Sequence, residues 1–335
     1  MKKTFLYFCL LFIVQTAFAA DSLYVREQQI PILIDRIDNV LYEMRIPAQK
    51  GDVLNEITIQ IGDNVNLSDI QAIRLFYSGV EAPSRKGEHF SPVTYISSHI
   101  PGNTRKALES YSVRQDEVTA PLSRTVKLTS KQPMLKGINY FWVSIQMKPE
   151  TSLLAKVATT IPNAQINNKP IDITWKGKVD ERHVGIGVRQ AGDDGSAAFR
   201  IPGLVTTNNG TLLGVYDIRY NSSVDLQEKI DIGVSRSTDK GQTWEPMRVA
   251  MTFKQTDGLP HGQNGVGDPS ILVDEKTNTI WVVAAWTHGM GNERAWWNSM
   301  PGMTPDETAQ LMLVKSEDDG KTWSEPINIT SQVKD

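Results

Sequence analysis

Short runs in which hydrophobic and polar residues alternate with a period of two recur along the chain, separated by turn-forming residues. Isoleucine alternates with polar residues over 57–61, which is the pattern of a half-buried strand. The runs 73–77, 138–147 and 169–175 are rich in β-branched and aromatic residues, which favour strands. No long run of helical period appears. The pattern predicts a β-sandwich over residues 21–180.

Three aromatic residues of this first domain, Tyr77, Phe90 and Tyr111, allow two interpretations. Exposed aromatic rings could stack on sugar rings. Core packing, or an interface with the next domain, is the interpretation that we favour. The polar, Gly-rich residues 176–198 are expected to connect the two domains.

Two octapeptides downstream are near copies of one another. Residues 237–244 read Ser-Thr-Asp-Lys-Gly-Gln-Thr-Trp, and residues 316–323 read Ser-Glu-Asp-Asp-Gly-Lys-Thr-Trp. Each follows an alternating apolar run, with Ile230, Ile232 and Val234 before the first copy and Ala309, Leu311 and Leu313 before the second. A repeated strand-turn unit cannot bury its apolar face alone, so the repeat predicts stacked blades of a β-propeller over residues 181–335.

The octapeptides have the chemistry of a tight turn. Asp239 and Asp318 can accept hydrogen bonds from backbone N–H groups a few residues ahead. Gly241 and Gly320 supply the positive φ that such a bend needs. The tryptophan that ends each copy is expected to fold back over the bend and pack between sheets.

Residues 1–20 have the pattern of a secretory signal peptide, with two lysines near the start, an apolar core over 5–14 and an Ala-Phe-Ala cleavage box at 17–19. The apolar core is too short to span a bilayer as a mature helix. Cys9, the one cysteine, lies in that core, so the mature chain is expected to have no cysteine chemistry. We expect export to the periplasm, the cell surface or the medium.

Composition and charge exclude some classes of partner. The formal net charge is −3 with mixed signs, so the sequence has neither a basic stripe for nucleic acid nor a polybasic membrane patch. No further stretch is long and apolar enough to predict a membrane span. About 315 mature residues are expected to form two domains.

The run Phe199-Arg200-Ile201-Pro202, followed by the two octapeptides (Asp boxes), resembles the bacterial sialidase (neuraminidase) family. Tyr-Asp-Ile-Arg at 216–219 and Gly-Asp-Pro-Ser at 267–270 strengthen the resemblance, which covers about residues 185–330. It implies an all-β protein, in which a β-sandwich accessory domain precedes the first blades of a six-bladed propeller.

The same resemblance implies an exo-α-sialidase that uses no cofactor. Such an enzyme hydrolyses terminal α-linked sialic acids of glycoproteins, glycolipids and oligosaccharides with retention of configuration. Sialic acid carries a carboxylate on its anomeric carbon, and a planar Arg can grip this group with paired hydrogen bonds, which Lys cannot reproduce. Arg200 matches the first of the three arginines that the family uses.

The resemblance assigns three more site residues. Asp225 matches the general acid by its spacing from Arg200, Arg219 is expected at the rim of the pocket, and Asp268 matches an aspartate near the acid and the N-acyl group. Asp217 is interpreted as structural, and Asp231 is the main competitor for the acid.

Loop residues His261, His288, Trp296 and Trp297 could line the same pocket, but packing is an equally good interpretation for each. No regular acidic loop of the EF-hand kind predicts a calcium site.

The family's tyrosine nucleophile, the glutamate that activates it and two of the three arginines come from later blades. The sequence ends at Asp335, after the second Asp box, and we expect it to be a truncated chain with negligible turnover alone. Completion by a second polypeptide is the alternative to truncation. For the function, the alternatives are a sialoglycan-binding protein without catalysis, a trans-sialidase or an intramolecular-transfer sialidase with the same motifs, and a structural surface protein.

Overall fold

The structure of the protein is a computed structural model that describes residues 22–27, 29–80, 112–177, 180–291 and 294–334. It also describes the backbone of a short hairpin, β6 (Ser84–Arg85) and β7 (Glu88–His89). The expected signal peptide at 1–20, Phe90 and Tyr111 lie outside the described residues.

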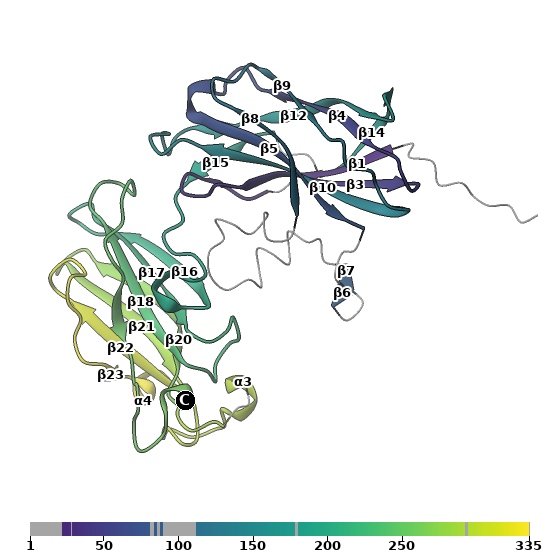
Figure 1. Ribbon diagram of the computed structural model, residues 1–335. Helices are drawn as coiled ribbons and strands as arrows, with labels where there is room; N and C mark the ends of the chain where they lie inside the picture. The colour runs from purple at the N-terminus through teal and green to yellow at the C-terminus, as the bar shows by residue number, and fades with distance from the viewer. Residues whose placement is uncertain are drawn as a thin grey trace, which may run out of the picture.

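The N-terminal part is a β-sandwich (Figure 1). Its larger sheet has the order β14-β1-β3-β10-β5-β8, formed by Asp172–Lys176, Ser22–Glu27, Asn39–Ala48, Gly137–Met147, Ile70–Gly79 and Val113–Thr119. Its smaller sheet has the order β13-β12-β4-β9, formed by Lys169–Pro170, Thr159–Ile166, Leu54–Ile61 and Thr125–Thr129. A three-stranded sheet joins β11 (Lys156–Val157), β15 (Arg182–Gly185) and β2 (Ile32–Leu33), and a single 3-10 turn, η1 (Leu67–Asp69), precedes β5.

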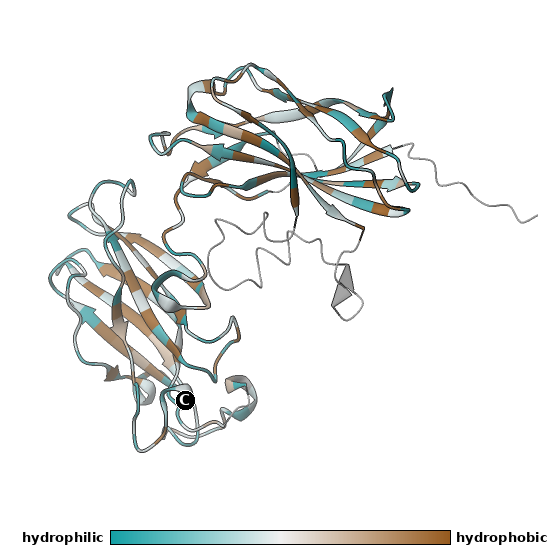
Figure 2. Cartoon of the chain, viewed as in Figure 1, coloured by the Kyte–Doolittle hydropathy of each residue, from teal (hydrophilic) through white to brown (hydrophobic). Residues whose placement is uncertain are grey.

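The sandwich core follows from the period-two pattern of the sequence. The three isoleucines of 57–61 lie on β4 and are fully buried, so the predicted strand is confirmed. They belong to one hydrophobic cluster with side chains of the larger sheet, among them Leu75 and Phe141. Figure 2 shows hydrophobic residues alternating with hydrophilic ones along the strands.

Two expectations about this domain have clear outcomes. The run 169–175 is not one strand, because it divides at Ile171 into β13 of the smaller sheet and β14 of the larger sheet, which pairs in parallel with β1. Tyr77 is 7% exposed and lies in the core, where its hydroxyl donates to Asn139 Oδ1 at 2.7 Å and its ring contacts Phe141. Core packing is therefore confirmed for Tyr77.

Two four-stranded antiparallel sheets follow, each built as a propeller blade (Figure 1). The first blade has β16 (Ala198–Thr206), β17 (Leu212–Arg219), β18 (Ile230–Ser237) and β19 (Arg248–Met251). The second has β20 (Val266–Asp274), β21 (Thr279–Trp286), β22 (Gln310–Ser316) and β23 (Ile327–Asn328). Valines at 215, 234, 282 and 314 are fully buried in one cluster that joins both sheets.

The remaining elements of this part are single helical turns: η3 (Asp193–Gly195), η4 (His261–Gln263), α3 (Ala295–Asn298) and α4 (Thr330–Val333). Among the residues described, no helix has the length and apolar character needed to cross a bilayer.

The predicted strand before the second Asp box is present as β22, but its buried residues are not those of the alternating apolar run. Met312 and Val314 are the buried residues, whereas Leu311 and Leu313 are half-buried and Ala309 precedes the strand. Both faces of β22 carry apolar residues because each face of a propeller blade can meet a neighbour, so alternation alone does not identify the inner one.

Both Asp boxes form the predicted turn, with the same hydrogen bonds. In the first, Asp239 Oδ1 accepts from Thr243 N at 2.9 Å and Oδ2 accepts from Thr243 Oγ1 at 2.6 Å. In the second, Asp318 makes the equivalent bonds to Thr322 at 2.9 and 2.6 Å. These donors, with the serine hydroxyls, lower the pKa of both aspartates to about 2, even though partial burial opposes the shift at Asp318.

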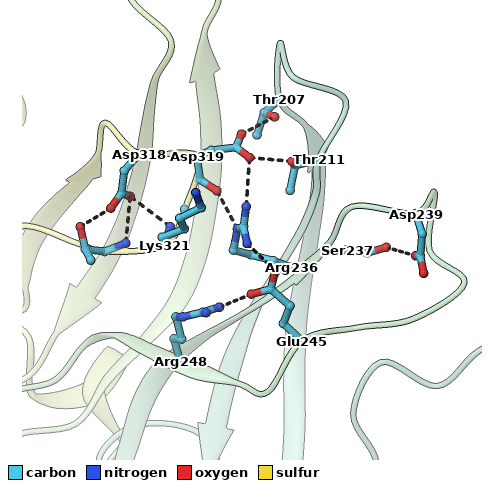
Figure 3. A network of polar contacts seen from close by, with 12 residues as sticks. Thr207, Thr211, Arg236, Ser237, Asp239, Glu245, Arg248, Asp318, Asp319 and Lys321 are labelled. Carbon is cyan, nitrogen blue, oxygen red and sulfur yellow. Dashed lines mark hydrogen bonds and ion pairs between the residues drawn. The ribbon is translucent and has the colours of Figure 1, made fainter.

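The second Asp box also joins the two blades (Figure 3). The carboxylate of Asp319 accepts from Thr207 Oγ1 at 2.6 Å, Thr211 Oγ1 at 2.6 Å and Arg236 Nη2 at 3.0 Å. Arg236 Nε donates to the Asp319 carbonyl at 2.7 Å. Lys240 occupies the equivalent position of the first box, and both residues have a left-handed backbone, with φ of +61° and +66°.

Candidate active site

The two sequence motifs that open the blades have the same local structure. The pairing of β16 with β17 is interrupted between Arg200 and Gly203, and that of β20 with β21 between Gly267 and Ser270. Each interruption contains a residue with positive φ immediately before a proline: Ile201 at +53° and Asp268 at +57°. Proline cannot donate to the ladder and is accommodated at such bulges. Non-glycine residues with positive φ store strain, which is typical of functional sites.

Asp225 lies on the loop between β17 and β18 and is held by two arginines. Arg200 Nη1 donates to Asp225 Oδ1 at 2.7 Å, and Arg219 Nη1 donates to the same oxygen at 2.5 Å. Both arginines also donate to the Ser223 carbonyl at 3.0 Å. Arg200 and Asp225 have side chains that are 42% exposed, whereas the Arg219 side chain is 1% exposed. The site therefore has one accessible cation and one accessible carboxylate in contact.

A third arginine approaches the same loop. Arg294 Nη1, from the segment before α3, donates to the backbone carbonyl of Asp225 at 3.2 Å. Arg294 was not expected from the sequence, because it is distant from Asp225 along the chain and lies in no motif. Partial burial raises the pKa of Asp225, but the hydrogen bond and charge of Arg219, with the charges of Arg200 and Arg294, outweigh this and leave that pKa below its ordinary value.

Asp217 lies beneath this pair on β17, directly across the sheet from Arg200. Its side chain is 1% exposed, and Oδ2 accepts from Arg219 Nε at 3.0 Å and Nη2 at 2.7 Å. Its other oxygen, Oδ1, accepts from the backbone N–H of Asp268 at 2.9 Å. Burial raises the pKa of Asp217 to about 6, although Arg219 and the Asp268 amide act in the opposite direction.

Asp231, the competitor for the acid, has different partners. It is 4% exposed at the start of β18, with Oδ1 at 2.8 Å from His261 Nε2 and Oδ2 accepting from Tyr220 OH at 3.0 Å. Burial and the neighbouring Asp231 charge raise the pKa of Tyr220. These residues line a surface hollow of about 520 Å³ that contains neither Arg200 nor Asp225.

Two family models match the chain. The N-terminal domain of BNR-repeat neuraminidase matches residues 20–170, and the BNR repeat-like domain matches residues 201–335. The chain belongs to the BNR-repeat neuraminidase, or sialidase, family. The family predicted from the Phe-Arg-Ile-Pro motif and the Asp boxes is thus confirmed, as is the all-β class.

Two sialidases match this chain across both of its domains. A sialidase of Bacteroides fragilis is 58% identical over 341 residues, which cover all of this chain and 62% of the relative. The solved structure of the Hadza microbial sialidase Hz136 has 61% identity and a TM-score of 0.80, and the match covers 93% of this chain and 60% of that one. A Paraclostridium sordellii sialidase is 35% identical over 40% of this chain and 30% of its own length. The chain spans about three fifths of the first two sialidases.

The structure brings together Arg200, Arg219 and Asp225, and it connects Asp268 to them through Asp217. The roles assigned to these residues from the sialidase resemblance stay predictions.

The loop residues that could line the pocket differ in their exposure. His288 is 6% exposed, with Nδ1 at 2.7 Å from Asn264 Oδ1, so it is a packing residue. Trp297 on α3 is 66% exposed, and the side chain of Trp296 lies outside the described residues.

Proposed function

We propose that the protein containing this chain is an exo-α-sialidase that hydrolyses terminal α-linked sialic acids of glycoproteins, glycolipids and oligosaccharides. The observation that carries the proposal is the contact between Arg200 and Asp225, 2.7 Å apart and equally accessible. Both groups can reach one monosaccharide that carries a carboxylate and a leaving oxygen on the same carbon.

Arg200 is the binding group in this proposal. Its guanidinium is permanently charged and planar, so it can pair with the sugar carboxylate through parallel hydrogen bonds. In the structure its Nη1 is directed at Asp225. A substrate carboxylate that takes this arginine must compete with Asp225 for it.

That competition provides a way to protonate the acid. With three arginines around it, Asp225 has a lowered pKa and is a carboxylate at neutral pH, which cannot donate a proton. When the substrate engages Arg200, Asp225 loses one cation and gains an anionic neighbour, and both changes raise its pKa. Asp225 then takes up a proton and gives it to the glycosidic oxygen as the bond from the anomeric carbon to that oxygen breaks.

Arg219 and Asp268 complete the part of the pocket that this chain supplies. Arg219 is fixed between two carboxylates, so it is a rigid donor beside Asp225. The Asp268 side chain is exposed on the neighbouring blade, at the end where the Asp225 loop lies, and can accept hydrogen bonds from sugar hydroxyl or amide groups.

We also propose that the protein is exported, on the basis of the signal-peptide pattern at 1–20. Amino-terminal sequencing of the protein from the periplasm or medium should begin just after the Ala-Phe-Ala box at 17–19. A mature amino terminus at Met1 would contradict this.

The activity is tested with sialyllactose and the protein that contains this chain, by following the reaction with proton NMR. The proposal expects free sialic acid to be released first as the α-anomer. Binding without release would favour a sialoglycan-binding protein, and sialyl transfer to an added sugar acceptor in place of hydrolysis would favour a trans-sialidase.

A further inference from the structure

A single buried carboxylate touches the site residues of both blades. Asp217 Oδ2 receives two donors from Arg219, and Oδ1 receives the backbone N–H of Asp268. Arg219 in turn donates to Asp225. The Asp225 loop and the strained Asp268 backbone, which belong to different blades, are therefore connected through one side chain.

The backbone of the second blade packs closely against Asp217. A Cβ added at Gly267 would lie 3.3 Å from Leu226 Cδ1 and 3.4 Å from Asp217 Oδ1. A side chain at 267 would therefore contact both residues, and the glycine keeps the approach of β20 to the carboxylate uncrowded. The charged groups that face Asp217 are Arg219 on its own strand and Asp268 on β20.

We propose that Asp217 is a positioning residue of the sialidase site, which fixes the guanidinium of Arg219 and the left-handed backbone of Asp268 and thereby sets the orientation of the acid loop. The expected effects on kinetics rest on the proposed function. The expected effects on the positions of Arg219, Asp225 and Asp268 do not.

A positioning role accounts for a buried carboxylate at this place in the blade. Desolvation makes the ionised form of Asp217 costly, as its raised pKa of about 6 indicates. A group that costs stability and lies next to the candidate acid fits a functional role better than a structural one. The negative charge of Asp217 also partly neutralises Arg219. Without it, the full charge of Arg219 would lower the pKa of Asp225.

The test replaces the carboxylate without changing its shape. Asp217→Asn keeps a carbonyl oxygen for the Asp268 amide, but it loses the anionic acceptor for Arg219. We expect kcat/KM for sialyllactose to fall about 10- to 100-fold, the scale of a catalytic group displaced by about 1 Å. The alkaline limb of the pH profile of kcat/KM should move to lower pH, because the charge of Arg219 then lowers the pKa of Asp225 further. Arg200 and Arg294 also face Asp225, and the substitution leaves both of them unchanged.

The matched control is Asp231→Asn, which removes another buried carboxylate of the same blade that contacts Tyr220 and His261 and not Arg219. It should leave the alkaline limb in place. An equal loss of activity in both variants, with no shift of the limb in Asp217→Asn, would overturn the inference and make Asp217 a structural residue.

A double-mutant cycle covers the case in which Asp217→Asn does not fold. The variant Asp217→Asn/Arg219→Gln has no unpaired buried charge. It should have the same kcat/KM as Arg219→Gln alone, because the asparagine still accepts from the Asp268 amide and the charge of Asp217 acts through Arg219. A further loss of 10-fold or more in the double variant would contradict the inference.

A crystal structure of Asp217→Asn separates this inference from the proposed function, since it needs no turnover. We expect the Arg219 guanidinium and the Asp225 carboxylate to move from their positions, whatever the reaction. An unchanged Arg219, Asp225 and Asp268 would overturn the positioning role, whereas absence of sialic acid release by the wild-type protein would overturn only the activity.

Discussion

Arg200 and Asp225 are 25 residues apart in sequence and form an ion pair in which Nη1 lies 2.7 Å from Oδ1. The pair forms because β16 and β17 run antiparallel, which brings the start of β16 next to the loop that follows β17. Arg219 donates to the same carboxylate oxygen from below. Because the candidate acid is paired with the candidate substrate-binding cation, we expect ligand binding and protonation to be coupled.

Binding of an uncleavable sialic acid analogue should therefore be accompanied by proton uptake. Asp225 is ionised in the free protein because its pKa is lowered, and this pKa rises when the analogue carboxylate takes Arg200. Between the two pKa values binding takes up as much as one proton, and affinity falls as the pH rises. Calorimetry in two buffers of different ionisation enthalpy measures the uptake.

Asp225→Asn is the control for this coupling, because it removes the titrating group and preserves its shape. Its binding enthalpy should not depend on the buffer. Equal proton uptake in the wild-type protein and in Asp225→Asn would show that another group takes up the proton.

The stability of the protein should depend on the ionisation of Asp217. Its folded pKa of about 6 lies above the ordinary value of 3.8, so its favourable contribution is complete below pH 3.8 and is lost as the pH rises through 6. A shift of this size corresponds to about 3 kcal/mol in the free energy of unfolding. Urea unfolding at pH 4 and pH 7 should show the wild-type protein losing about this much relative to Asp217→Asn. Parallel pH dependence in the two proteins would contradict the account.

The contribution of the contact between the blades to stability can be tested at Asp319. The equivalent residue of the first Asp box, Lys240, provides the control. Asp319→Asn weakens the acceptor of Thr207, Thr211 and Arg236, and it should lower the free energy of unfolding by about 2 kcal/mol, the scale for disrupting a hydrogen bond to a buried charged group. Lys240→Asn changes the equivalent residue of the first box, and asparagine tolerates the left-handed backbone of both positions.

Because Lys240 is exposed, its replacement should change stability by no more than about 0.5 kcal/mol. Urea unfolding measures both variants. Equal changes in Asp319→Asn and Lys240→Asn would mean that the network of Figure 3 does not stabilise the contact between the blades.

Removing the hydrogen bonds of the turn in the second Asp box should destabilise the protein by a smaller amount. Asp318→Ala removes the acceptor of the Thr322 amide and hydroxyl, and we expect a loss of about 1 kcal/mol, similar to the removal of a helix cap. Glu317→Ala removes the adjacent carboxylate, whose side chain is 67% exposed and contacts Lys315, and it should be nearly neutral. If thermal unfolding midpoints of the two variants coincide, the box does not stabilise the turn.

The sequence predicts the local features best, because their hydrogen bonds join residues close in the chain. The Asp boxes and the strand β4 are examples. The proximity of Asp225 to Arg200 was expected only because the family resemblance gives the spacing between the motif arginine and the acid. Arg294 was missed, since it reaches Asp225 from 69 residues away, and the place where 169–175 divides depends on which sheet each half joins. Contacts of this kind are set by the tertiary fold.

The central claim is that Arg200 binds the carboxylate of a sialic acid and that Asp225 protonates its leaving oxygen. The most direct measurement compares hydrolysis of sialyllactose with that of an aryl sialoside, whose good leaving group needs little protonation, by the protein that contains this chain and by its variants. Asp225→Asn should lose about 10²- to 10⁴-fold in kcat/KM on sialyllactose, the range for a general acid, and much less on the aryl sialoside. Arg200→Lys should lose a similar factor on both. Equal losses on the two substrates in Asp225→Asn, or no release of sialic acid by the wild-type protein, would contradict the account.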